Sequence, residues 1–160
     1  TKMKKIFLSL ILIIGLFGCS EKNTAAETKY YDMLKLISQR EEYSTSSDNF
    51  TISAEISPIS EGRYRYFVTL DKPKLAMYEV EILAIEEGKE YINEVAANAG
   101  VLLDDIYNLM PNQSDISKGY ISGINISGET NNEHPVLYVL VQWHNKELTI
   151  VSREYFKIEL

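Results

Sequence analysis

Hydrophobic and polar residues alternate through most of the chain after residue 50, with the period of two that is typical of half-buried β-strands. The alternation occupies residues 50–57, 63–70, 77–85 and 119–127. Residues 136–144 are apolar on both faces, which predicts a central strand that carries Trp143. Residues 147–160 supply a last set of strand-forming side chains. The pattern therefore predicts six or seven strands.

A different period precedes these strands. Between residues 25 and 42, apolar side chains recur at spacings of three and four, which predicts an amphipathic helix of three or four turns. Such a helix either packs on the domain or stands apart as a stalk that recognises a partner. Residues 20–29 are polar and read as a short tether.

Strands with polar turns between them, and no alternation of strands with helices, predict a mostly β protein. We expect an antiparallel β-sandwich, immunoglobulin-like in kind, with an N-terminal amphipathic helix. The paired cysteines of antibody domains are missing, because the chain has one cysteine. The connection at residues 86–118 is less regular than the rest, and connections of this length are usually functional or partly structured.

An uncharged run, residues 6–17, follows three lysines near the start of the chain. As a helix it reaches roughly 18 Å, well short of the roughly 30 Å hydrocarbon core of a bilayer, so it fits a signal peptide better than a membrane span. The run ends in Leu16-Phe17-Gly18-Cys19, which resembles the lipobox of bacterial lipoproteins. The resemblance implies cleavage between Gly18 and Cys19 and a diacylglyceryl group on the Cys19 sulfur. A plain secretory signal with an incidental cysteine, or an uncleaved anchor, are the alternatives.

These observations predict three regions. Residues 1–18 form a lipoprotein signal peptide, residues 19–29 hold the lipidated cysteine and the tether, and residues 30–160 form a single β-rich extracytoplasmic domain. The resemblance implies that the chain is held in the cell membrane by lipidated Cys19, on its extracytoplasmic face.

Charge narrows the choice of partners. The full sequence has a net charge of −7, and removal of residues 1–18 takes away three lysines and no acidic residue, leaving about −10. Nucleic acid is excluded as a partner, because its binding depends on an excess of Lys and Arg. A single cysteine closes no internal disulfide, so a hydrophobic core must hold the domain together.

Candidate chemistry is sparse, and the sequence predicts no catalytic residue, no metal site and no cofactor. Nucleophilic catalysis usually needs a histidine beside the nucleophile, and the chain has two histidines, His134 and His144. Glu133 and His134 with the distant His144 offer a metal site in principle, but plain surface residues are the commoner case. Asp104 and Asp105 offer a carboxylate pair for acid–base work or Ca²⁺, though adjacent acidic side chains point different ways.

If the strands at 63–70 and 77–85 are antiparallel neighbours, Arg63 and Arg65 lie near Glu79 and Glu81 on the solvent face. We interpret such pairs as ordinary sheet surface. The candidate binding surface is instead either the sheet that bears Tyr64 and Tyr66 or the 86–118 connection. The alternation also permits these two tyrosines to lie in the core. The candidate residues are Tyr64, Tyr66, Asp104, Asp105 and Tyr107.

The sequence therefore predicts a non-catalytic, membrane-anchored binding or adaptor module at the cell envelope, whose partner is an envelope protein or a glycan. Two alternatives remain open. One is an accessory envelope hydrolase with Asp104 or Asp105 as the acid. The other is a structural subunit of an envelope complex, docked through the helix at residues 25–42.

Overall fold

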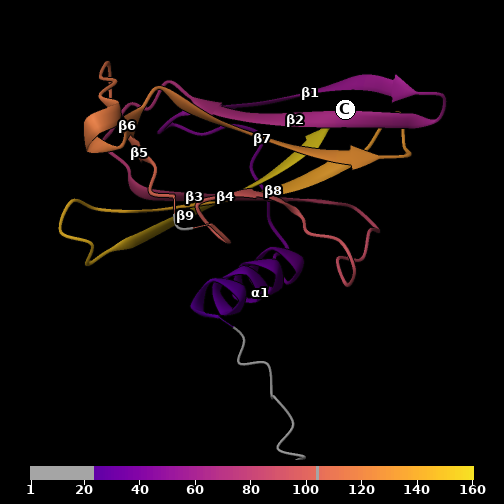
Figure 1. Ribbon diagram of the computed structural model, residues 1–160, viewed down its shortest axis with the longest axis horizontal. Helices are drawn as coiled ribbons and strands as arrows, with labels where there is room; N and C mark the ends of the chain where they lie inside the picture. Colours follow the sequence, from indigo (N-terminus) through magenta and orange to yellow (C-terminus); the bar gives the residue numbers. More distant parts are fainter. Residues whose placement is uncertain (1–23, 104) are drawn as a thin grey trace, which may run out of the picture.

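Two antiparallel β-sheets pack face to face, and a helix covers the outer side of one of them (Figure 1). The computed structural model describes residues 24–103 and 105–160. Gly18, Cys19 and Asp104 lie outside the described residues. The mostly β fold, with an N-terminal helix and two sheets packed like a sandwich, is the one that the sequence predicts.

The first sheet has three strands in the order β1-β2-β7, and the second has four in the order β4-β3-β8-β9. A short parallel pair, β5 with β6, lies beside them. The strands are β1 (Thr51–Ser60), β2 (Arg63–Asp71), β3 (Tyr78–Glu86), β4 (Ala97–Ala99), β5 (Asn108–Leu109), β6 (Tyr120–Ile121), β7 (Gly123–Thr130), β8 (Val136–His144) and β9 (Val151–Glu159). A 3-10 turn, η1 (Ile116–Lys118), precedes β6.

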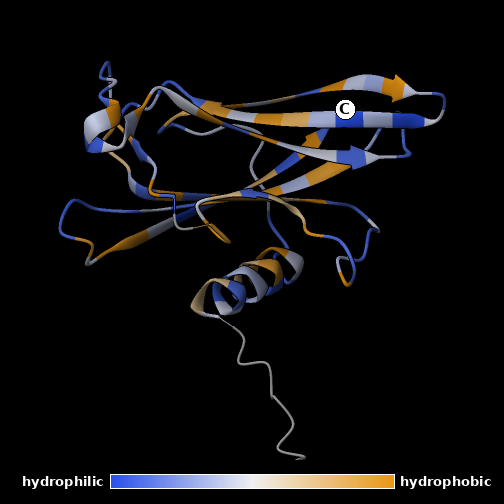
Figure 2. Cartoon of the chain, in the orientation of Figure 1, coloured by the Kyte–Doolittle hydropathy of each residue, from blue (hydrophilic) through white to orange (hydrophobic). Residues whose placement is uncertain are grey.

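The main core lies between the two sheets. Every second residue of β2 points inward, and Tyr66, Val68 and Leu70 are fully buried there. Strand β8 is buried on both faces, and Trp143 lies in the core beside Phe50, as predicted for a central strand. Figure 2 shows the alternation of hydrophobic and hydrophilic residues along the strands of both sheets.

Helix α1 (Ala25–Ser38) forms a third layer. Its buried face, Tyr30, Met33 and Ile37, packs on Leu83 of β3 and Leu140 of β8 in a second hydrophobic cluster. The helix thus packs on the domain, and the stalk alternative is wrong. It begins at Ala25 because Thr24 and Glu27 form a capping box, so residues 25–29 belong to the helix and not to a tether.

One predicted neighbourhood is wrong. Strands β2 and β3 lie in different sheets, so Arg63 and Arg65 do not face Glu79 and Glu81. The segment between β2 and β3 crosses from one sheet to the other, and β2 pairs with β1 and β7 instead. Nor is Glu81 on a solvent face, because helix α1 covers that side of the second sheet.

The connection at residues 86–118 is partly structured, as it holds the short strands β4 and β5 and the turn η1. Within the part of the chain that the structure describes, no helix is long and apolar enough to cross a membrane.

Candidate functional site

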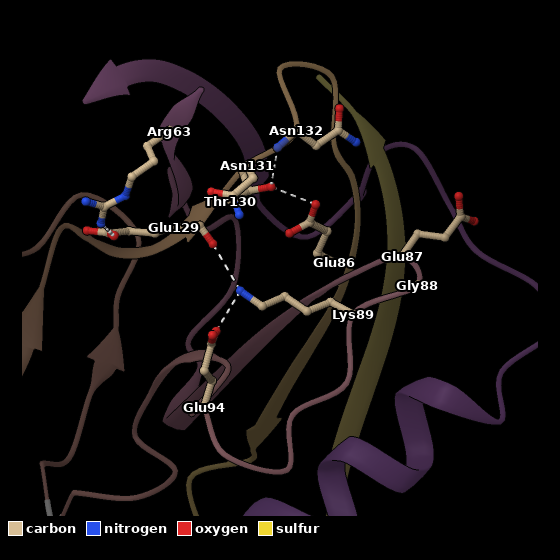
Figure 3. A pocket seen from close by; sticks show the side chains of 10 residues that line it. All are labelled: Arg63, Glu86, Glu87, Gly88, Lys89, Glu94, Glu129, Thr130, Asn131 and Asn132. Carbon is tan, nitrogen blue, oxygen red and sulfur yellow. Dashed lines mark hydrogen bonds and ion pairs between the residues drawn. The ribbon is translucent and has the colours of Figure 1, made fainter. Parts of the chain in front are cut away.

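A polar groove opens at one end of the molecule, where elements of both sheets meet (Figure 3). Its volume is about 800 Å³, and it is open to solvent. Three segments supply its walls: the start of β2, the end of β3 with the connection that follows it, and the end of β7 with the turn that follows. The lining residues are Arg63, Glu86, Glu87, Gly88, Lys89, Glu94, Glu129, Thr130, Asn131 and Asn132.

One wall of the groove belongs to a three-residue charge cluster, two members of which, Arg63 and Glu129, line the groove. Arg63 donates to Oε2 of Glu129 at 2.6 Å, and Arg65 donates to Oε1 of the same carboxylate at 2.6 Å. The cluster forms because β2 and β7 are antiparallel neighbours and Arg65 lies directly opposite Glu129. Hydrogen bonds from Arg65 and Arg63 lower the pKa of Glu129 below its usual 4.5, so this carboxylate is ionised at neutral pH.

Lys89 closes the groove on the other side. Its Nζ lies 2.7 Å from Oε2 of Glu94 and donates to the backbone oxygen of Glu129 at 3.1 Å (Figure 3). Burial works to lower the pKa of Lys89, but the hydrogen bond to Glu94 and the nearby carboxylates outweigh it and raise the pKa above 10.5. Lys89 is therefore charged at neutral pH and joins the turn after β3 to strand β7.

The floor is built from uncharged donors and carboxylates. Thr130 donates its hydroxyl hydrogen to Oε1 of Glu86 at 2.7 Å, and its oxygen accepts the backbone N–H of Asn132 at 3.0 Å. Glu87 accepts from the Tyr138 hydroxyl at 2.5 Å. The Thr130 hydroxyl thus donates one hydrogen bond and accepts another, and both shape the turn. It is not held as a nucleophile.

The pKa values of two groove residues bear on proton transfer. A general acid or base works best with a pKa near the working pH, and the shifts of Lys89 and Glu129 run away from neutrality. What the groove offers is a set of fixed charged and amide groups close to solvent. Such groups suit a polar ligand that carries several hydrogen-bonding atoms.

A second polar cluster lies under the N-terminal end of α1. Lys29 donates to Oε1 of Glu81 at 2.6 Å and to the backbone oxygen of Gly100 at 3.0 Å. Glu81 also accepts from Gln142 at 2.5 Å, and Gln142 accepts from Arg153 at 2.5 Å. Glu81 is 6% exposed, and the row crosses β3, β8 and β9 at directly paired positions. Because every member is hydrogen-bonded to the next, we interpret this row as the attachment of the helix to the sheet.

The structure divides the candidate binding residues that it describes between two places, Tyr64 and Tyr66 in one and Asp105 and Tyr107 in the other. Tyr66 is 2% exposed and lies in the core near Glu86 and Tyr91, and Tyr64 is half-buried on the same inward side of β2. Asp105 is exposed and accepts from the Tyr107 hydroxyl at 3.4 Å. The backbone of Tyr107 binds that of Val80, near the opposite end of β3 from Glu86.

The two histidines also lie apart. His134 precedes β8, and His144 is the last residue of that strand. His134 contacts the backbone oxygen of Leu160 through Nδ1 at 3.3 Å. Among residues 24–103 and 105–160, no group of three or more His, Cys, Asp and Glu side chains could hold a metal ion.

The groove residues were missed at the level of sequence because they come from segments that are distant in the chain. The turn formers at residues 128–135 predict a loop between strands, but no local pattern predicts that it meets the turn at residues 86–89. The pairing of β2 with β7, which creates the Arg63–Arg65–Glu129 cluster, is equally non-local.

Comparisons of the chain with protein-family models, with curated proteins and with solved structures gave no match.

Proposed function

We propose that this protein is a lipid-anchored, extracytoplasmic module of the cell envelope that binds a partner without transforming it. The observation that carries the proposal is the order of segments at the N-terminal end. An uncharged run leads into Leu16-Phe17-Gly18-Cys19, and a capped helix that packs on the domain begins at Ala25. A lipobox that stands directly before a folded domain is the arrangement expected of a lipoprotein.

The distance between anchor and domain is short under this proposal. Four residues lie between Cys19 and the helix cap Thr24, which makes five steps along the chain, and an extended chain covers at most about 3.6 Å per step. The cap therefore lies within about 18 Å of the lipidated sulfur. Two or more acyl chains on one cysteine give stable membrane attachment, whereas one chain gives only marginal binding.

The polar groove supports binding as the role of the domain. Its cations and carboxylates already pair with one another, which presents a fixed arrangement to a ligand. We expect an envelope protein or a glycan as the partner. The acidic charge of the mature chain argues against nucleic acid.

Two other functions are kept as alternatives. An envelope hydrolase would use Asp104 or Asp105 as its acid, and that role has little support, because Asp105 is exposed and does not line the polar groove. A structural subunit would dock through α1, where Tyr31 is 53% exposed beside the buried face of the helix. The immunoglobulin-like kind of the sandwich is likewise a proposal, which the two packed antiparallel sheets support.

Expression of the full chain in a bacterium that is fed an alkyne-labelled fatty acid tests the anchor. We expect the label on the wild-type chain, recovery in the membrane fraction, and loss of both in Cys19→Ala. Ser20→Ala, one residue further on, is the matched control and keeps the label. Membrane recovery of Cys19→Ala equal to that of the wild type would overturn the proposal.

A further inference from the structure

The outward side of the three-stranded sheet is a broad exposed surface, which we call the outer face. It consists of the alternate residues of β1, β2 and β7 whose side chains point away from the core. Helix α1 packs on the outward side of the second sheet, whereas at the outer face residues 110–114 border one end, beside Thr51, Thr69 and Asn125. Figure 1 shows the helix, the four-stranded sheet and the three-stranded sheet as successive layers.

An aromatic ring lies at the centre of the outer face. Phe67 occupies the middle of the central strand β2, between the inward residues Tyr66 and Val68, and its side chain is half-buried. Glu55 of β1 and Ser127 of β7 are its direct partners across the sheet. The ring is therefore flanked by side chains that are polar and, on the β7 side, short.

Short uncharged groups dominate the rest of the outer face. The hydroxyl and amide side chains there are Thr51, Ser53, Ser57, Thr69, Asn125 and Ser127. The outer face has no lysine, and it carries two arginines and three acidic residues, so its positive and negative charges nearly balance. In a chain of strongly acidic composition this surface is close to neutral, so it suits an uncharged polyhydroxylated partner better than a basic protein.

Hydrogen bonds hold much of this surface in place. Asn125 donates to the Thr69 hydroxyl at 2.7 Å across the sheet, and Arg63 and Arg65 are both fixed on Glu129. Short side chains and fixed charged groups lose little conformational entropy when a ligand binds. The outer face is thus organised in advance of binding.

The outer face also runs into the polar groove. Arg63 and Glu129 belong to both, so a ligand that lies along β2 and β7 reaches the groove without leaving the surface. If the chain is anchored at Cys19, the short tether places the helix layer toward the membrane and this face on the side away from it. That orientation rests on the proposed function, whereas the chemistry of the face does not.

We propose that the outer face binds a polysaccharide chain, with a sugar ring stacked on Phe67 and neighbouring hydroxyl groups bonded to Asn125, Arg65 and Glu129. The C–H face of a pyranose ring packs on an aromatic ring, and its hydroxyls pair with amide, guanidinium and carboxylate groups. A protein partner would use a larger apolar patch with aromatic anchors at its centre, and nucleic acid would need an excess of cations.

Sedimentation with insoluble polysaccharide tests this proposal. The purified full chain in detergent is mixed with peptidoglycan sacculi, chitin or cellulose, and the bound fraction is measured against polysaccharide concentration. We expect retention on at least one of the three. Phe67→Ser removes the ring, and Ser127→Lys places a long side chain beside it, so each is expected to weaken retention at least tenfold.

Ser46→Lys makes the same chemical change at an exposed position that is not part of the outer face and is expected to bind like the wild type. Thermal unfolding of all four proteins checks that they are folded. Absence of wild-type retention on every polysaccharide, or equal loss in Ser127→Lys and Ser46→Lys, overturns the proposal. Fatty-acid labelling of Cys19 is a separate measurement, so a chain that binds polysaccharide but is not acylated overturns only the anchor.

Discussion

At the scale of single residues, the burial of Tyr66 depends on a glycine on the neighbouring strand. Tyr66 of β2 is paired with Gly128 of β7, and its ring lies over the place where a side chain at residue 128 would begin. A Cβ built on Gly128 collides with Oη and Cζ of Tyr66. The missing side chain is what lets a large aromatic residue fill this part of the core.

We therefore expect Gly128→Ala to lower the free energy of unfolding by about 2–3 kcal/mol, because the Tyr66 ring must leave its position or the strands must separate. Ser127→Ala, at the adjacent exposed position, should change it by less than about 0.5 kcal/mol. Urea unfolding of the two variants measures the difference. In a double variant, Gly128→Ala with Tyr66→Leu, the free energy of unfolding should fall by less than the sum of the two single losses. An unchanged urea midpoint for Gly128→Ala alone would refute the packing argument.

Burial of Tyr66 also makes stability depend on pH on the alkaline side. Burial, followed by the neighbouring Tyr91 and Glu86, raises the pKa of Tyr66 far above its ordinary 10.0. Between about pH 10 and the raised value, the unfolded chain releases this proton and the folded chain keeps it, so stability is full below pH 10 and falls as pH rises.

We expect the free energy of unfolding to fall by up to about 1.4 kcal/mol per pH unit above pH 10 for each such tyrosine. Tyr66→Phe should reduce this dependence of the free energy of unfolding on pH. The comparison concerns the slope alone, because the variant and the wild type can differ in stability at pH 7. Unfolding in urea at pH 7, 10 and 11 measures the slope for both chains. Identical slopes would show that Tyr66 ionises at its ordinary pKa.

At the scale of elements, the attachment of α1 combines an apolar stripe with a polar row that is buried at its centre, at Glu81 and Gln142. Tyr30, Met33 and Ile37 supply the apolar contact, and Lys29 joins the row at Glu81. When one partner of a buried hydrogen-bonded pair is removed, the other partner stays buried without a hydrogen bond. The resulting loss of folding free energy is usually larger than the net contribution of the intact pair. The row therefore fixes where the helix sits on the sheet.

Glu81→Leu removes the acceptor of both Lys29 and Gln142 and should lower the free energy of unfolding by about 2–3 kcal/mol. Adding Gln142→Leu should recover part of this loss, because the stranded amide is then gone. Glu133→Leu, at an exposed loop position, is the control and should be nearly neutral. Chemical unfolding followed by circular dichroism measures all three, and a neutral Glu81→Leu would contradict the role assigned to the row.

The elements themselves were largely predictable, because hydrophobic periodicity is a local signal. The pattern predicts a central strand at residues 136–144, and β8 has those bounds. The apolar spacing predicts a helix over residues 25–42, and α1 begins at Ala25 but ends at Ser38. The partners of the strands were not predictable, because alternation assigns a face to each residue but does not say which strand lies beside it. Glu81 illustrates this: the alternation assigns it to a polar face, but helix α1 covers that face and buries Glu81.

At the scale of the whole molecule, three layers create two apolar interfaces. One lies between the sheets and the other between α1 and the second sheet. A chain with a single cysteine has no internal disulfide to hold it, so these two interfaces carry its stability. The same layering separates the helix side from the outer face, and this separation gives the proposed anchor a consequence that can be measured.

If Cys19 is lipidated, its sulfur is no longer a free thiol, and an introduced cysteine becomes the only reactive one. We expect a fluorophore on Ala25→Cys to transfer energy to acceptor lipids more efficiently than one on Ser53→Cys. Ala25 is the first residue of the helix and lies within about 22 Å of the anchor along the chain, whereas Ser53 lies on the outer face. The helix and the two packed sheets lie between residues 25 and 53, and packed layers are roughly 10 Å apart. Energy transfer in reconstituted vesicles measures the difference, and equal efficiency at both positions would show that the outer face is not held away from the membrane.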